Sequence, residues 1–221
     1  NPGSNTTNTV TLSKAPLGIA VTGTYNGTTS YTNGTSDVVI TLTGLVGGDS
    51  GKNGVTAALN SANVSANSTN FVNSITSSAF TVGNYSLYDT TGSGAARNAT
   101  AGNTQNLVTL SKAPLGINLN ATYNGTDSYS STIKTNGLVG NDVTPGVASV
   151  TIDNANVANN ASNYIKTVTG ATGVNDTNLL NNYIISSSAS GTPTTDNPGS
   201  NTTNTVTLSK APLGIAVTGT Y

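Results

Sequence analysis

The chain repeats itself at a fixed period. Residues 1–25 recur without change as residues 197–221, an offset of 197 minus 1, or 196. The decapeptide VTLSKAPLGI begins at Val10, Val108 and Val206, so its successive copies start 98 residues apart. A sequence that is self-similar at a fixed period folds as an array of similar units. The chain is therefore expected to contain two complete units of about 98 residues and a fragment at each end.

The period extends beyond the decapeptide. The Tyr-Asn-Gly-Thr and Asn-Tyr segments align at an offset of 98, whereas the central Gly-Leu-Val-Gly segment aligns at 93. One five-residue deletion and one compensating insertion explain both offsets. Length changes of this kind indicate a shared fold with varied loops. The aligned pairs are 25–28 with 123–126, 44–47 with 137–140, and 84–85 with 182–183.

Both units have an all-β pattern. Short runs of alternating apolar and polar residues are separated by Gly, Asn and Asp turns, and no stretch sustains an apolar period of 3.6 residues. In the first unit the pattern predicts strands at Thr9–Ser13, Leu17–Tyr25, Asp37–Thr43, Val55–Val64, Asn70–Ile75 and Phe80–Tyr88. In the second it predicts strands at Leu107–Ser111, Leu115–Tyr123, Ser130–Lys134, Ala148–Val157, Asn163–Val168 and Asn182–Ser187.

Each unit carries a tyrosine followed by an Asn-Gly turn at the end of an alternating run. Asn-Gly supplies the positive φ values that a tight turn needs, so hairpin-like corners are expected here. The corner residues are Tyr25, Asn26 and Gly27 in the first unit and Tyr123, Asn124 and Gly125 in the second.

Domain boundaries are expected at the recurring Lys-Ala-Pro-Leu segments, because proline cannot donate a ladder hydrogen bond and restricts the preceding residue. The junction residues are Lys14, Ala15, Pro16 and Leu17, and Lys112, Ala113, Pro114 and Leu115. The resulting division is 1–15 (closing strand of a preceding domain), 16–113 and 114–211 (two domains), and 212–221 (opening strand of a following domain). Linkers of nearly zero length favour a stiff rod. For the terminal fragments, continuation of the chain is favoured over strand exchange between subunits.

The amino-acid composition argues against several classes of function. Charged residues make up 7% of the chain, its net charge is −1, and it lacks His, Cys, Met and Trp. Nucleic acid and anionic membranes are therefore poor partners, and no apolar run is long enough to cross a bilayer. Every acidic residue is Asp, and no constellation of acids, nucleophile and base is found, so no catalytic, cofactor or metal site is expected. The polar, weakly charged and Cys-free chain is typical of an exported, extracellular object.

Several sharper interpretations of single residues stay open. Asp49–Gly54 has Asp, Asn and Gly where a calcium loop begins, but Gly51 lacks a ligand and Asn60 stands in place of the closing Glu, which favours an ordinary turn. Calcium at domain junctions is a weaker alternative, since four further Asp residues lie in loop-like stretches. Lys14 and Lys112 are expected to be solvated, with isopeptide crosslinking as the alternative. Asn-x-Ser/Thr sequons occur at nearly the frequency that composition predicts. The four Asp residues are Asp37, Asp127, Asp142 and Asp176.

Aromatic residues recur at matched positions in the two units. In an all-β chain without Trp they are most simply core and corner residues whose hydroxyls bond the backbone, and a glycan-stacking platform is the alternative. The matched residues are Tyr25 with Tyr123, Tyr85 with Tyr183, and Phe71 with Tyr164.

The Lys-Ala-Pro-Leu junction, the Tyr-x-Gly-Thr corner, the central Gly-Leu-Val-Gly and the late Asn-Tyr together resemble the YDG-type and MBG-type repeats of large secreted bacterial adhesins. The chain departs from that pattern in having Tyr-Asn-Gly for Tyr-Asp-Gly and in carrying few charges. The resemblance implies two tandem Ig-like β-sandwich domains that act as stalk segments.

We therefore expect a non-enzymatic segment of a long extracellular fibre, adhesin stalk or sheath at the cell surface. Its partners would be neighbouring repeats of the same protein, with lateral self-association between chains. The alternative is an adhesive module that binds host or surface glycans, or a protein, and gains avidity from repetition.

Overall fold

The computed structural model describes residues 10–35, 37–51, 53–88, 106–143, 147–169, 179–185 and 204–221. Over these residues the chain forms β-strands joined by loops and short 3₁₀ helices, which confirms the all-β prediction. The chain divides into two compact units. The first unit comprises residues 1–23, 29–61 and 66–110, and the second comprises 24–28, 62–65 and 111–221.

The first unit contains a four-stranded and a three-stranded sheet. The longest strand of the larger sheet, β1, pairs with its three other strands, and β4 is the central strand of the smaller one. The larger sheet contains β1 (Ala15–Thr24), β3 (Val39–Thr43), β6 (Tyr85–Leu87) and β7 (Asn106–Ser111). The smaller sheet contains β2 (Ser30–Thr32), β4 (Thr56–Leu59) and β5 (Val72–Thr76).

Strand β1 changes partner along its length. Its first residues, from Ala15 to Leu17, run parallel to β6, and its next residues run antiparallel to β3, with Gly18 opposite Thr43. Pro16 occupies the second position of this strand, where a missing N–H disturbs the ladder least. Leu17 is 0% exposed, so this last junction residue packs into the core, whereas Lys14 and Pro16 are exposed.

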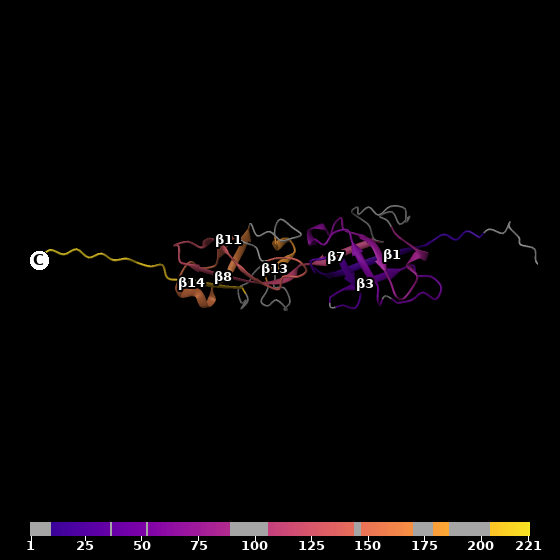
Figure 1. Ribbon diagram of the computed structural model, residues 1–221, viewed down its shortest axis with the longest axis horizontal. Helices are drawn as coiled ribbons and strands as arrows, with labels where there is room; N and C mark the ends of the chain where they lie inside the picture. The colour runs from indigo at the N-terminus through magenta and orange to yellow at the C-terminus, as the bar shows by residue number, and fades with distance from the viewer. Residues whose placement is uncertain are drawn as a thin grey trace, which may run out of the picture. The chain divides into compact units, whose positions relative to one another are not determined.

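The second unit repeats this topology, with β8 in the place of β1 and β11 at the centre of the smaller sheet. Figure 1 labels β8, β11, β13 and β14 of this unit. The closing strand β14 runs parallel to β8, with Asn204 opposite Ile117 and Ser209 opposite Thr122. The larger sheet contains β8 (Ala113–Thr122), β10 (Lys134–Asn136), β13 (Tyr183–Ile185) and β14 (Asn204–Ser209). The smaller sheet contains β9 (Ser128–Thr132), β11 (Val147–Ile152) and β12 (Ile165–Thr169).

Both sheets of the second unit contribute side chains to one core. Alternate residues of each strand point to the same face, so β8 buries Leu115, Ile117 and Leu119 while β11 buries Val150 and Ile152. The core is aliphatic apart from its tyrosines, because the sequence has no Trp and its two Phe residues lie in the other repeat. Burial of this apolar surface is the main favourable contribution to folding of the unit.

Several strands are shorter than the alternation predicted. The run expected at 55–64 is β4 followed by the 3₁₀ helix η1 (Val64–Ala66), and that expected at 148–157 is β11 followed by η3 (Val157–Ser162). Asparagine side chains bond the backbone in both places and compete with the sheet ladder. Likewise η2 (Val82–Asn84) precedes β6 and η4 (Leu179–Asn181) precedes β13. Residues 186 and 187 of the strand expected at 182–187 lie outside the described residues.

The short strands β2 and β10 were not predicted as separate elements. The prediction of hairpin-like corners was wrong, since β1 and β2 on either side of Asn26-Gly27 belong to different sheets. The same holds for β8 and β9 around Asn124-Gly125. The first corner therefore carries the chain between the two sheets of the first unit, and the second corner does the same in the second unit.

Residues 10–14 and 210–221 of the two terminal repeat copies are not in strands, whereas residues 15–24 and 204–209 of these copies form β1 and β14. Residues 10–13 of the strand expected at Thr9–Ser13 form no ladder, and neither do residues 210–221; Thr9 lies outside the described residues. Leu12 is 89% exposed, whereas the identical position Leu110 in β7 is 2% exposed. A closing strand of this type needs a preceding long strand as its partner, as β7 has in β1.

Candidate functional site

Two tyrosines of the second unit converge on one carboxylate. The hydroxyl groups of Tyr25 and Tyr183 each donate a hydrogen bond of 2.8 Å to Asp142 Oδ2. The Tyr183 hydroxyl also accepts a bond of 2.9 Å from the backbone N–H of Val139. The two rings meet edge to face, with centroids 5.3 Å apart and planes at 80°. We call Val139, Gly140, Asp142 and Tyr183 the second-unit docking site, and Tyr25 is the side chain that it holds.

Burial sets the electrostatics of this site. Tyr25 is 2% exposed and Tyr183 is 1% exposed, and Asp142 Oδ1 is buried without a hydrogen-bond partner among the described residues. Burial, together with the hydrogen bond to Asp142, raises the pKa of Tyr183 well above that of a free tyrosine. The Tyr183 hydroxyl therefore stays protonated at neutral pH and can donate its hydrogen bond to Asp142.

The turn after Tyr25 packs directly against the docking site. Gly27 has φ +74°, and a Cβ at that position would lie 2.7 Å from the carbonyl oxygen of Val139 and 2.8 Å from Gly140 Cα. Such distances are shorter than any side chain tolerates, so only glycine permits both the backbone angle and the close approach. The Asn-Gly corner predicted from the sequence is thus also a contact surface.

A second segment from the first repeat is also built into the second unit. The backbone N–H of Val64 donates to Asn182 Oδ1 at 2.8 Å, and Asn182 Nδ2 donates to Asn63 Oδ1 at 3.0 Å. Asn182 is 2% exposed, so these bonds satisfy a buried amide. Residues 24–28 and 62–65 both precede β8 in the chain, yet both belong to this unit.

The first unit contains the same set of docking residues, at Val46, Gly47, Asp49 and Tyr85, which we call the first-unit docking site. Tyr85 donates to Asp49 Oδ2 at 2.6 Å and accepts from the Val46 N–H at 3.0 Å. The hydrogen bond to Asp49 raises the pKa of Tyr85. An open cavity of about 720 Å³ lies beside Asp49 and is lined otherwise by residues 75–82. Val46 is 55% exposed.

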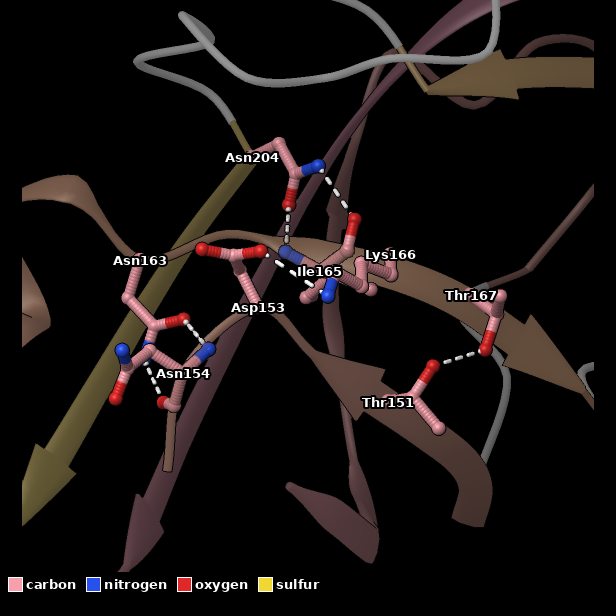
Figure 2. Close-up of polar contacts among 8 residues, drawn as sticks. All are labelled: Thr151, Asp153, Asn154, Asn163, Ile165, Lys166, Thr167 and Asn204. Atoms are coloured by element: carbon pink, nitrogen blue, oxygen red, sulfur yellow. Dashed lines mark hydrogen bonds and ion pairs between the residues drawn. The ribbon is translucent and has the colours of Figure 1, made fainter. Parts of the chain in front are cut away.

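Buried and half-buried asparagines bridge the backbone in both units. Asn204, on β14, accepts from the Ile165 N–H and donates to the Ile165 carbonyl, both at 2.9 Å, and so joins the two sheets (Figure 2). Asn163 pairs in the same way with Asn154. In each case the side-chain amide bonds the N–H and the carbonyl of one backbone residue, as a neighbouring strand would do in a sheet. The other bridges are Asn160 with Leu208, Asn67 with Leu110, Asn70 with Ser61, and Asn106 with Val72.

Sequence reasoning missed these bridges. Their asparagines recur at the same offsets of 98 and 93 as the aligned segments, and this recurrence is the signal that could have identified them. Figure 2 also shows Lys166 paired with Asp153 at 3.1 Å and Thr151 bonded to Thr167. The ion pair is exposed and contributes little to stability.

The second corner and the junction residues predicted from the sequence differ in how exposed they are and in what they contact. The second corner is exposed: Tyr123 is 39% exposed, and a Cβ on Gly125 would have no atom of the described residues within 4 Å. Lys14 is exposed, and Lys112 donates to the carbonyl oxygen of Leu180 at 2.8 Å. The Ala-Pro-Leu parts of the two junctions, at 15–17 and 113–115, lie in β1 and β8.

Two of the candidate calcium ligands bond tyrosine hydroxyl groups, and a third lies in a turn. Asp49 and Asp142 bond tyrosines, and Asp37 has a left-handed backbone with φ +66°. In the described part of the chain no three acidic or other metal-binding side chains gather into a possible metal site. Asp176 lies outside the described residues.

Within the ranges that the structure describes, no helix is both long and apolar enough to span a bilayer. The chain matches no protein-family model, and neither curated proteins nor solved structures yielded a significant match.

Proposed function

We propose that the chain is a non-enzymatic structural segment of a long extracellular fibre, adhesin stalk or sheath. In this proposal, tandem Ig-like β-sandwich domains supply length and stiffness, and the polar surface keeps the fibre hydrated at the cell surface. The observation that carries the proposal is the packing of Tyr25 onto Asp142 and Tyr183. A residue of one repeat that completes the core of the next unit is what a stalk needs in order to transmit force along its chain.

The sheet arrangement supports the sandwich. Each unit has one four-stranded and one three-stranded sheet, and in the second unit both sheets contribute buried side chains to a single core. This is a common way for all-β domains of about 100 residues to bury their apolar faces. The motifs that resemble YDG-type and MBG-type repeats favour the same architecture.

The connection between strands of successive repeats supports the stalk. Strand β7 ends at Ser111 and β8 begins at Ala113, so Lys112 is the only residue between them. The Lys112 side chain is itself held by the carbonyl oxygen of Leu180. A connection this short has almost none of the conformational freedom of a flexible linker.

Antibody labelling tests the location and the form of the assembly. Antibodies raised against the 221-residue chain should label unpermeabilised cells of the source organism along thin surface fibres, with many labels on each fibre. Labelling that requires permeabilisation, or that marks only fibre tips, would contradict the proposed stalk.

A further inference from the structure

Strands β8 and β14 of the second unit run parallel and pair directly with each other. They match along six residue pairs, from Asn204 opposite Ile117 to Ser209 opposite Thr122. The pairing continues one step beyond these pairs, because the backbone N–H of Tyr123 donates to the Ser209 carbonyl at 2.9 Å. In a parallel pair the hydrogen bonds are evenly spaced along both strands. Strand β14 is therefore attached to β8 along its whole length.

The chain enters and leaves this strand pair at opposite ends. Lys112 immediately precedes β8, and Lys210 immediately follows β14. Because the strands are parallel, the start of β8 and the end of β14 lie at opposite ends of the pair. Tension between Lys112 and Lys210 therefore acts along the strands and tends to slide one past the other. It loads all six residue pairs together, whereas tension across the strands would break them one after another.

Side-chain bridges attach β14 to other parts of the unit. Asn160 donates to the Leu208 carbonyl at 2.9 Å and accepts from the Leu208 N–H at 3.0 Å. Asn204 bonds both backbone groups of Ile165 in β12 (Figure 2). Val206 and Leu208 are 1% and 2% exposed. Sliding of β14 would therefore break these bridges and also pull two apolar side chains out of the core.

The preceding repeat has the same arrangement. Strand β7 pairs with β1. Ser111, at the end of β7, accepts from the Tyr25 N–H at 2.8 Å, which matches the contact at the end of β14. Asn67 donates to the Leu110 carbonyl at 2.8 Å and accepts from the Leu110 N–H at 2.9 Å. The pairing and its asparagine bridge are thus features of the repeat and not of one copy.

We infer that the β8–β14 pair is a mechanical clamp, which keeps the second unit folded when the chain is pulled along its length. The rate of forced unfolding depends on the barrier to rupture. A ladder loaded in shear raises that barrier, because each residue pair shares the load with its neighbours. The inference rests on the proposed function, since a fibre at the cell surface is where such tension arises. It adds resistance to forced unfolding to the length and stiffness of the stalk.

Pulling single molecules of the 221-residue chain in two directions tests the inference. The sequence has no Cys, so two introduced thiols define where the force is applied. Lys112→Cys with Lys210→Cys loads the strand pair in shear. Asn120→Cys with Lys210→Cys is the matched control, because Asn120 lies opposite Thr207, near the end at which β14 finishes. Force between these two positions peels the same ladder from Ser209 onward, and all three replaced side chains are exposed.

The force at rupture in optical tweezers is the first measurement. At one loading rate, shear should require a force at least about twofold higher than peeling, and equal sharing of the load over the six pairs would give about sixfold. The length of chain released, at about 3.3–3.6 Å per residue, identifies the second unit as the part that unfolds. This comparison changes no residue of the core.

A bridge variant provides the second measurement. Asn160→Ala, added to the shear variant, should unfold at least about tenfold faster at constant force, because both backbone groups of the buried Leu208 lose a partner. Asn67→Ala is the control. It removes the equivalent bridge at Leu110, outside the segment between the two thiols, so the unfolding rate should not change.

Equal rupture forces in the two directions would overturn the inference. So would an Asn160→Ala variant that unfolds under load as slowly as its parent. Neither result affects the labelling of fibres on cells, which tests the proposed function. Failure of the clamp is therefore distinguishable from failure of the proposed stalk.

Discussion

Removing the Asn204 side chain should selectively weaken the second unit. Asn204 is 1% exposed and holds both the N–H and the carbonyl of Ile165, which is 0% exposed, at 2.9 Å each. Asn204→Ala leaves both backbone groups without their partner. An unpaired buried polar group costs about 1–3 kcal/mol, so the two together cost about 2–4 kcal/mol once some water enters the gap.

Native-state hydrogen exchange read by mass spectrometry is the appropriate assay, because it reports each unit separately. Amides of β12 and β14 should exchange about 30- to 1000-fold faster in Asn204→Ala, the fold-change that corresponds to that loss. Asn106→Ala should produce the same change around Val72 in the first unit, where Asn106 makes the equivalent pair of bonds. Asn120→Ala, at an exposed position of β8, serves as the control and should change exchange little.

The isosteric substitution Asn204→Asp gives the effect a pH dependence. A buried carboxyl facing the Ile165 carbonyl can donate to it only when protonated, so burial should raise its folded-state pKa above the ordinary value of about 3.9. A raised folded pKa contributes stability that is present below the unfolded pKa and is lost as pH rises. Asn204→Asp should therefore approach wild-type stability near pH ~3 and fall behind it at neutral pH. The bridging role of Asn204 would be refuted if Asn204→Ala lowered the free energy of unfolding by less than about 0.5 kcal/mol. It would also be refuted if the stability of Asn204→Asp relative to wild type did not change with pH.

Three further outcomes follow from the docking site. Tyr25→Phe removes a buried donor to Asp142 and should destabilise the second unit by about 1–2 kcal/mol in urea denaturation, whereas Tyr123→Phe should be neutral. Gly27→Ala should lower the free energy of unfolding by about 1–3 kcal/mol more than Gly125→Ala does. Both substitutions strain a backbone with positive φ, but only the new Cβ at position 27 would lie 2.7 Å from a backbone atom. Equal losses of stability would argue against close packing at Gly27. Because the pKa of Tyr183 is raised in the folded state, the contribution of Tyr183 to stability should be constant below pH ~10 and fall as pH rises further. Tyrosinate absorbance should follow this loss, and Tyr183→Phe should make the loss smaller.

Periodicity and alternation sufficed to predict the all-β class and most strand positions, because both depend on local pattern. They could not predict which copy of a segment is folded. Leu17 and Leu213 have the same neighbours in sequence, yet Leu17 is 0% exposed in β1 and Leu213 is 83% exposed. Strand formation here depends on partners such as β3 and β6, which lie far along the chain. Local sequence cannot show whether such partners are present.

The candidate site was predicted only in part. The Asn-Gly corner was evident from turn chemistry, but its carboxylate partner was not, since Asp142 is 117 residues away from Tyr25. The repeat alignment contained the missing signal. It pairs Asp49 with Asp142 at the offset of 93 and Tyr85 with Tyr183 at 98, and these two matched pairs are the polar side chains of both docking sites.

Repetition of these units is proposed to produce a stiff and extended chain, and the length of tandem arrays tests this most directly. Chains of two, four and eight tandem copies of residues 16–211 can be imaged by atomic force microscopy to measure their end-to-end distance. A stalk with one-residue connections predicts a distance that grows in proportion to the number of copies. Growth with the square root of that number, as for units on flexible linkers, would contradict the proposal.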